Sequence, residues 1–287
     1  MITTSAVPDM TLTPDWRLVF HDNFDQSNLD MNKWWTRYVY NDGYLDYLND
    51  EWERYRESGN HVMTGSTLRL TALPFDDSQG FYPSGMIRSK DTYPIYNGDE
   101  WYFESRIKVA GFKGAWNAFW IAGSERVAGD DQSIPWPPEI DQMEVVNNGQ
   151  DDTCSMLHTS GQVNDWNNNP QNYGGLWAAD NFGWQWMCLY TTDLSQEFHR
   201  YGLYYKAGEF VTYLDRKPIL QCSYNWVADD RQPMPGCYVL LNLAVGGQWA
   251  GRYGVDDSAL PAFMEVDYVH VYTRVPQSTI GHNLLPT

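Results

Sequence analysis

The chain has 287 residues, of which 37 are acidic and 19 basic, so its formal net charge at pH 7 is −18. An acidic surface confers solubility. It argues against nucleic acid as a partner, because phosphate binding requires basic residues. A neutral substrate fits an acidic surface better than a sulfated polymer does. No apolar run approaches the about 18 residues of a membrane span, and the first residues lack the cationic and apolar regions of a signal peptide.

The predicted elements, taken in chain order, are short β-strands. Apolar or alternating runs lie at residues 66–73, 100–111, 115–123, 209–220, 237–247 and 264–272, and clusters of Gly, Pro, Asn and Asp separate them. A period of two with many β-branched and aromatic residues is typical of strands, and no long amphipathic helix stands out. The pattern predicts an all-β sandwich or jelly roll, with residues 1–15 as an N-terminal arm, 16–274 as one domain and 275–287 as a C-terminal tail.

The run at 115–123 indicates a strand that is covered on both faces. Phe119 and Ile121 share one face, whereas Trp116, Ala118 and Trp120 share the other. A strand with large groups on both sides needs two covers, of which one is a second sheet and the other could be a ligand. In the run at 237–247, the face expected in the core carries Val239, Leu241, Leu243 and Val245, and the less apolar face carries Asn242 and Ala244.

The stretch PPEIDQMEVVNNG at 137–149 carries three carboxylates whose spacing does not fit a regular strand. Glu139 and Asp141 share a face, but Glu144 has the opposite parity and would lie buried beside Ile140, which is costly for an unpaired charge. A β-bulge resolves the conflict, because it places two residues, Gln142 and Met143, in one position of the alternation. The bulge separates two sets: Ile140, Met143 and Val145 face the core, and Glu139, Asp141 and Glu144 face the other side.

Three acids on one face of a strand favour acid–base chemistry. Their mutual repulsion raises at least one pKa, and glycoside hydrolysis needs one protonated acid beside one ionised carboxylate. Neighbouring positions on one face lie roughly 7 Å apart in Cα, from which we expect the two carboxyl groups to converge to the about 5–5.5 Å of a retaining mechanism. A calcium site or a merely solvated acidic strand are the alternatives.

The four cysteines do not form a zinc motif. They are Cys154, Cys188, Cys222 and Cys237, and none belongs to a CxxC pair. Four cysteines allow three disulfide connectivities, between which the sequence does not choose. Buried free thiols are an equally good interpretation.

Several motifs together resemble those of the glycoside hydrolase family 16 enzymes, over about residues 17–273. EIDQME matches the bulged signature E-[ILV]-D-x-x-E, LNDEWERY at 48–55 resembles N-N-E-x-Q-x-Y, and YPSGMIRSK at 82–90 resembles S-G-x-I-x-[ST]-K. GAWNAFWI at 114–121 resembles G-x-W-P-A-F-W, with Asn117 where proline is common. The resemblance implies a β-jelly roll of two antiparallel sheets with the substrate in a long cleft on the concave face.

The resemblance also implies a role for each acid in a retaining mechanism without a cofactor. Glu139 is expected to be the nucleophile that forms a glycosyl-enzyme ester. Glu144 is expected to be the general acid that protonates the departing oxygen, and then the base that activates water. Asp141 is expected to hydrogen-bond to Glu139 and to help hold the two charge states apart.

The resemblance assigns further residues to substrate or metal. Sugar contacts are expected from Trp116, Trp120, Trp249, Asn49, Arg88 and His158. For Asn49, Arg88 and His158 the alternatives are a surface-loop asparagine, an ion-paired arginine and a structural histidine. Asp267 matches a position that often ligates a structural Ca²⁺ on the convex side, with backbone carbonyls as further ligands.

The bulged form of the signature indicates the substrate class. In the family it accompanies β-1,3-glucanases of the laminarinase type, agarases and carrageenases, and the acidic charge counts against sulfated galactans. We therefore expect an endo-hydrolase of a β-1,3-glucan. A bacterial exopolysaccharide or an agar-type galactan stays open, because the loops at 124–138 and 161–186 match no subfamily. A transglycosylase, or a non-catalytic glycan-binding protein on the same fold, are the functional alternatives.

The expected partners follow from this substrate. They are a polysaccharide or oligosaccharide, with no nucleic acid and no membrane, and the protein is expected to be a monomer. An extracellular location is inferred from the polymeric substrate alone.

Overall fold

The structure is a computed structural model that describes residues 9–95, 98–124, 138–162, 184–227 and 233–274. Its strands are β1 (Trp16–Asp22), β2 (Trp34–Trp35), β3 (Glu53–Tyr55), β4 (His61–Met63), β5 (Leu68–Ala72), β6 (Tyr82–Ser84), β7 (Met86–Ser89), β8 (Glu100–Lys108), β9 (Ala115–Gly123), β10 (Glu139–Asn147), β11 (Met156–Gln162), β12 (Trp184–Tyr190), β13 (His199–Lys206), β14 (Gly208–Leu214), β15 (Lys217–Tyr224), β16 (Cys237–Val245) and β17 (Ala262–Arg274). The helices in the described ranges are α1 (Tyr40–Gly43), α2 (Gly247–Ala250) and the 3-10 turn η2 (Asp257–Ala259). None of them has the length or the apolar character that crossing a membrane requires.

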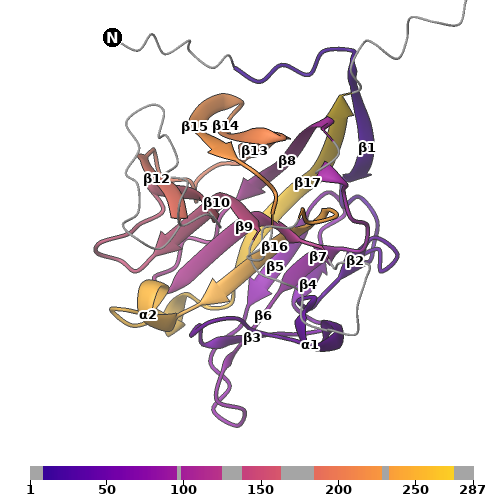
Figure 1. The fold of residues 1–287 in the computed structure, drawn as a ribbon. Coiled ribbons are helices and arrows are strands. Elements are labelled where there is room, and N and C mark those ends of the chain that lie inside the picture. The colour runs from indigo at the N-terminus through magenta and orange to yellow at the C-terminus, as the bar shows by residue number, and fades with distance from the viewer. Residues whose placement is uncertain (1–8, 96–97, 125–137, 163–183, 228–232, 275–287) are drawn as a thin grey trace, which may run out of the picture.

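Two antiparallel sheets form the body of the molecule (Figure 1). One has the strand order β15-β14-β13-β8-β17-β5-β4, with β1 also pairing with β17, and the other has the order β12-β11-β10-β9-β16-β7-β2. A short parallel pair, β3 and β6, lies beside them. The predicted all-β sandwich of two antiparallel sheets is thereby confirmed.

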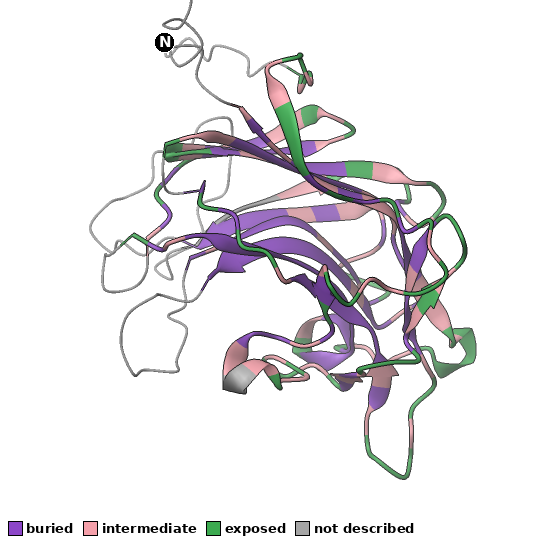
Figure 2. Cartoon of the chain, turned by 90° about the vertical axis from the view of Figure 1, so that its right-hand side faces the viewer, coloured by how far each residue is buried: buried purple, intermediate pink, exposed green. Residues whose placement is uncertain are grey.

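The main hydrophobic core lies between the two sheets. Phe103 and Val269 enter it from the eight-stranded sheet, and Phe119 and Ile121 enter it from the seven-stranded sheet. Trp120 belongs to a second cluster on the opposite face of β9, as the strand parity predicts. β9 and β16 are buried along almost their whole lengths, and Figure 2 shows the same nearly continuous burial in the central strands.

The expected single strand at 209–220 is wrong, because the chain folds back within it. β14 ends at Leu214, β15 begins at Lys217, and the two pair as an antiparallel hairpin. The turn residues Asp215 and Arg216 both have left-handed backbones, with φ of 49° and 65°. Two residues of positive φ form the turn that suits the twist of a hairpin, but glycine or asparagine normally marks it in the sequence. Neither residue stands at these two positions, so the alternating pattern gave no indication of a turn.

The predicted bulge in β10 is confirmed by the register of the sheet. Asp141 pairs with Trp120 and Met143 pairs with Phe119, so Gln142 is the extra residue. Met143 is fully buried in the core between the sheets. The Gln142 side chain is also fully buried, and none of the described residues hydrogen-bonds to its amide.

The four cysteines are free thiols in the structure, which is one of the two alternatives that the sequence leaves open. Cys154, Cys222 and Cys237 are buried, and burial raises the pKa of each thiol. They therefore behave as small apolar core residues.

The division into arm, domain and tail stays a prediction. Residues 1–8 and 275–287 lie outside the described residues, as do most of the loops at 124–138 and 161–186. Within the expected arm, the half-buried Met10 and Leu12 pack against Tyr102, Val211 and Tyr213 on the eight-stranded sheet.

Candidate active site

The bulge arranges the acids in cross-strand rows on the face of the seven-stranded sheet that points away from the core. Directly opposed residues of neighbouring strands share a face. One row contains Ser160, Asp141, Trp120, Leu240 and Arg88, and the next contains His158, Glu144, Ala118, Asn242 and Met86. The expected site residues Asp141, Trp120 and Arg88 therefore lie along one row, with Glu144 and His158 in the adjacent row.

Glu139 lies at the far end of the acid series. It pairs with Ala122, whereas Glu144 pairs with Ala118, so their Cα atoms are four residues apart along β9, about 13 Å. This separation is larger than the roughly 7 Å between Cα atoms that was expected from the sequence. The two carboxyl groups therefore converge only if both side chains lean toward Asp141. The pKa of the Tyr40 phenol is raised first by burial and then by the charge of Glu139.

Burial makes the other two acids hard to ionise. It raises the pKa of Asp141 to about 7, although the Ser160 hydroxyl donates a 2.7 Å hydrogen bond to the Asp141 carboxylate. Burial, and then the charge of Asp141, raise the pKa of Glu144 well above its usual value. The indole N–H of Trp116, 3.1 Å from Glu144 Oε1, opposes this shift. Glu144 is therefore placed to carry a proton at the start of a reaction.

The segment at 49–51 brings a further carboxylate to the acids, that of Glu51, which was not among the expected site residues. Burial raises the pKa of Glu51, and the charge of Glu51 in turn helps to raise that of Glu144. Asn49, the residue expected to bind sugar, is exposed and donates a 3.3 Å hydrogen bond to Glu51 Oε1. Asn49 therefore reaches the site through Glu51. The E of the N-N-E-x-Q-x-Y segment was the signal available in the sequence.

Glu53 stands where that segment has glutamine, and its carboxyl group is fully buried. One oxygen accepts a 2.8 Å hydrogen bond from the backbone N–H of Val245, and none of the described residues bonds to the other. Burial raises the pKa of Glu53 to about 8. The folded protein thus holds a proton that the unfolded chain releases near the ordinary value of 4.5.

A consequence is that the stability contributed by protonated Glu53 is present at acidic pH and is lost as the pH rises from 4.5 through about 8. Glu53→Gln is neutral at every pH and keeps the acceptor for Val245. We expect this variant to have a higher Tm than the parent at pH 8 and a similar Tm at pH 5, in thermal unfolding followed by circular dichroism. Equal Tm differences at both pH values would contradict the burial of an ionisable proton here.

Trp120 and Arg88 lie beneath other side chains on this face. The Trp120 indole N–H donates a 2.7 Å hydrogen bond to Asn242, and the ring packs with Tyr38 and Tyr55. Arg88 is 5% exposed, and its guanidinium lies 4.6 Å from the Tyr238 ring. Arg88 is three strands, about 14 Å, from Asp141. Their contact with sugar therefore stays a prediction.

Asp152, which was not among the expected site residues, bonds to two of them, His158 and Trp249. One carboxylate oxygen lies 2.8 Å from His158 Nε2, and the other accepts a 2.8 Å hydrogen bond from the Trp249 indole. The Trp249 ring is 4.9 Å from that of Trp116 and 5.0 Å from that of His158. Burial alone would raise the pKa of Asp152, but the hydrogen bonds from His158 and Trp249 outweigh it and lower the pKa. The ionised Asp152 carboxylate therefore fixes the positions of His158 and Trp249 beside the acids.

Asp267, the expected calcium ligand, has a different partner in the structure. Its carboxylate accepts a 2.6 Å hydrogen bond from Arg106 and forms an ion pair with it. Within the described ranges there is no group of three or more His, Cys, Asp or Glu side chains placed to hold a metal ion. The structure thus gives the calcium prediction no support.

Comparison with known proteins identifies one family over most of the chain. The family model described as Glycosyl hydrolases family 16 matches residues 49–269. A beta-glucanase of Rhodothermus marinus is 28% identical over an alignment of 278 residues that covers 91% of this chain and 87% of that protein. An endo-1,3-1,4-beta-glycanase of Rhizobium meliloti (strain 1021) is also 28% identical, over 88% of this chain but only 51% of that protein.

The fold is likewise similar to solved structures. The X-ray structure of the laminarinase from Rhodothermus marinus superposes with a TM-score of 0.69 at 25% identity, covering 91% of this chain and 98% of that one. The same strand arrangement therefore occurs in a polysaccharide hydrolase at low sequence identity.

Proposed function

The chain belongs to family 16 of the glycosyl hydrolases, and from this premise we propose that it is a retaining endo-hydrolase of a β-1,3-glucan. It is a glycoside hydrolase, and its relatives support cleavage within a β-glucan. The observation that carries the proposal is the bulge in β10, which puts Glu139, Asp141 and Glu144 on one face and leaves Glu144 with a raised pKa.

In the proposed first step, a Glu139 oxygen attacks the anomeric carbon while the bond from that carbon to the leaving oxygen breaks. The proton of Glu144 passes to the leaving oxygen, so that the departing sugar leaves as a neutral alcohol. The raised pKa of Glu144 supports this role, because the proton must be present at the start. Asp141, between the two, is proposed to hydrogen-bond to Glu139 while that group carries charge.

In the second step, the ionised Glu144 takes a proton from water, and the resulting hydroxide oxygen bonds to the anomeric carbon. The bond to Glu139 breaks, and both carboxyl groups return to their starting protonation states. The two displacements restore the original anomeric configuration. Only carboxyl groups of this chain act, so the mechanism needs no cofactor.

The β-1,3-glucan is proposed as the substrate on the bulged signature and on the relatives. An agar-type galactan or a bacterial exopolysaccharide is the alternative, because the sequences at 124–138 and 161–186 match no subfamily. Transglycosylation is also compatible, since a sugar can take the place of water in the second step. We further propose that the protein acts outside the cell, because a polymeric substrate does not enter cells. We also propose that it acts as a monomer.

A reducing-end assay on laminarin, mixed-linkage glucan, agarose, carrageenan and bacterial exopolysaccharides tests the proposal. We expect the highest rate on laminarin, and NMR of the first products should show retained anomeric configuration. Products longer than the substrate would indicate a transglycosylase, and binding without hydrolysis would indicate a glycan-binding protein. An inverted product would exclude the proposed role of Glu139.

Asp152 is expected to matter for the reaction because it orients Trp249 and His158. Asp152→Ala removes both hydrogen bonds, and we expect kcat/KM on a short glucan oligosaccharide to fall about 10- to 100-fold, since small displacements in a site have effects of this size. Asp152→Asn keeps an oxygen for the Trp249 indole and offers an N–H to His158, so it should recover part of the loss.

The matched control is the neighbouring Asp151→Ala. The Asp151 carboxylate contacts Arg252 and Tyr253 at the surface and is about half exposed. We expect it to leave kcat/KM on the same oligosaccharide unchanged. Equal effects of the two alanine variants, or a parental rate for Asp152→Ala, would show that the reaction does not depend on the hydrogen bonds that Trp249 and His158 make with Asp152.

A further inference from the structure

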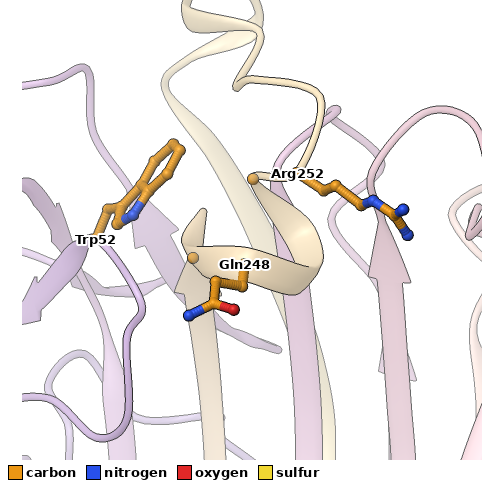
Figure 3. A pocket seen from close by; sticks show the side chains of 5 residues that line it. Trp52, Gln248 and Arg252 are labelled. Atoms are coloured by element: carbon orange, nitrogen blue, oxygen red, sulfur yellow. The ribbon is translucent and has the colours of Figure 1, made fainter.

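A shallow depression of about 670 Å³ lies beside α2 (Figure 3). It is lined by Trp52, Gly247, Gln248, Gly251 and Arg252. Figure 3 shows the Trp52 ring and the Arg252 side chain on the two sides of α2, with Gln248 between them. None of these side chains has a part in the reaction described above.

The backbone beside the depression is shaped to hold the Trp52 ring. A Cβ atom at Gly246 would lie 2.4 Å from the indole, and one at Gly251 would lie 2.8 Å from it. Gly246 also has a φ of 80°, which disfavours any other residue. The two glycines let the ring lie against the turn, yet Trp52 stays 43% exposed. A large ring is therefore fixed in place with much of its surface in solvent.

Polar groups flank this ring. Gln248 is exposed, and its backbone N–H donates to Asp50, which fixes the start of α2. The Arg252 side chain is 62% exposed, and its guanidinium bonds to Asp151 at 3.0 Å. A flat aromatic surface packs against the C–H groups of a sugar, while amide and guanidinium groups can hydrogen-bond to its hydroxyls. Because Arg252 is already paired with a carboxylate, the chemistry fits a neutral sugar better than an anion.

The depression is separate from the acid site but adjoins it. The charge of Glu51 acts on Glu144, whereas the next residue, Trp52, packs on the turn at Gly246. On α2, Trp249 bonds to Asp152 at the acid site, whereas Gln248 lines the depression. A single helix of four residues thus separates the two.

We propose that the depression around Trp52 is an accessory binding site for a second segment of the glucan that the acid site cleaves. The inference rests on the proposed function. A polymer that occupies both places binds more tightly than either contact alone allows, because the second contact becomes intramolecular. An oligosaccharide that fills only the acid site gains nothing from it.

The test uses the full chain with Glu139→Gln and Glu144→Gln combined, so that the glucan survives the measurement. Affinity electrophoresis measures binding of laminarin, and calorimetry measures binding of a short laminarin oligosaccharide. Adding Trp52→Ala should weaken laminarin binding about tenfold or more and leave oligosaccharide binding unchanged. Adding Gln248→Ala should weaken laminarin binding in the same direction, and this exposed residue does not support the packing of Trp52.

The matched control is Phe198→Ala, which removes an aromatic ring that lies over Arg106 and Lys108 of β8, in the other sheet. It should leave both affinities unchanged. Laminarin binding that Trp52→Ala does not alter, or an equal loss for polymer and oligosaccharide, would overturn the inference while leaving the proposed function intact. Failure of the folded parent to bind laminarin would remove the proposed function and the inference with it.

Discussion

Glu139→Ala is expected to lower kcat on laminarin about 10⁴-fold or more, because removal of a nucleophile that forms a covalent intermediate has effects of this order. The protein should keep its fold, since Glu139 lies at the start of β10 and is half-buried. Reducing-end assays measure the loss. Azide should restore part of the activity, because it can enter the space that the carboxylate vacates and attack the anomeric carbon from the same side.

The configuration of the azide product makes this test specific. A single displacement by azide in Glu139→Ala gives a glycosyl azide of inverted configuration, which NMR distinguishes from the retained form. A retained azide product would instead assign Glu139 the acid–base role. Parental activity in Glu139→Ala would exclude it from the reaction altogether.

Glu144→Ala is expected to lower kcat/KM on laminarin about 10²- to 10⁴-fold, the usual contribution of a general acid. The loss in the first step should be much smaller for a dinitrophenyl glycoside, whose leaving group departs without protonation. In this variant the glycosyl ester on Glu139 can still form, so azide should give the retained glycosyl azide. The two alanine variants therefore yield opposite products from one reagent.

The pH dependence of kcat/KM gives a second test of Glu144 as the group that protonates the leaving oxygen. Burial and the charge of Asp141 raise its pKa, and the acid form is the active one. Activity of the parent should therefore fall as the pH rises through this raised pKa, and the fall should be absent from Glu144→Ala with the dinitrophenyl substrate. An unchanged alkaline limb in the variant would mean that another group supplies the proton.

Local periodicity explains how much of the site could be predicted. Strand parity alone required the bulge in β10, because a regular strand would bury Glu144 with Ile140, and the register confirms it. Parity also assigned Phe119 and Trp120 to opposite faces of β9. These inferences succeeded because a two-residue period and the cost of a buried charge act between neighbours in the chain.

Features that depend on contacts between distant segments could not be predicted from the sequence. Asp152 and Trp249 are 97 residues apart, and the packing of α2 against β10 brings them together. The pairing of Asp267 with Arg106 joins residues 161 positions apart. Nothing in the spacing of these residues indicates their partners.

The sequence by itself determined the all-β class, the two faces of β9, β10 and β16, and the side of β10 on which the three acids lie, because these follow from alternation along one segment. The tertiary structure alone decided which protonation states burial favours in the acids, that Glu51 and Asp152 join the site, and that Trp52 stays exposed beside it. Those properties depend on desolvation and on contacts between segments far apart in the chain, which a local period does not contain.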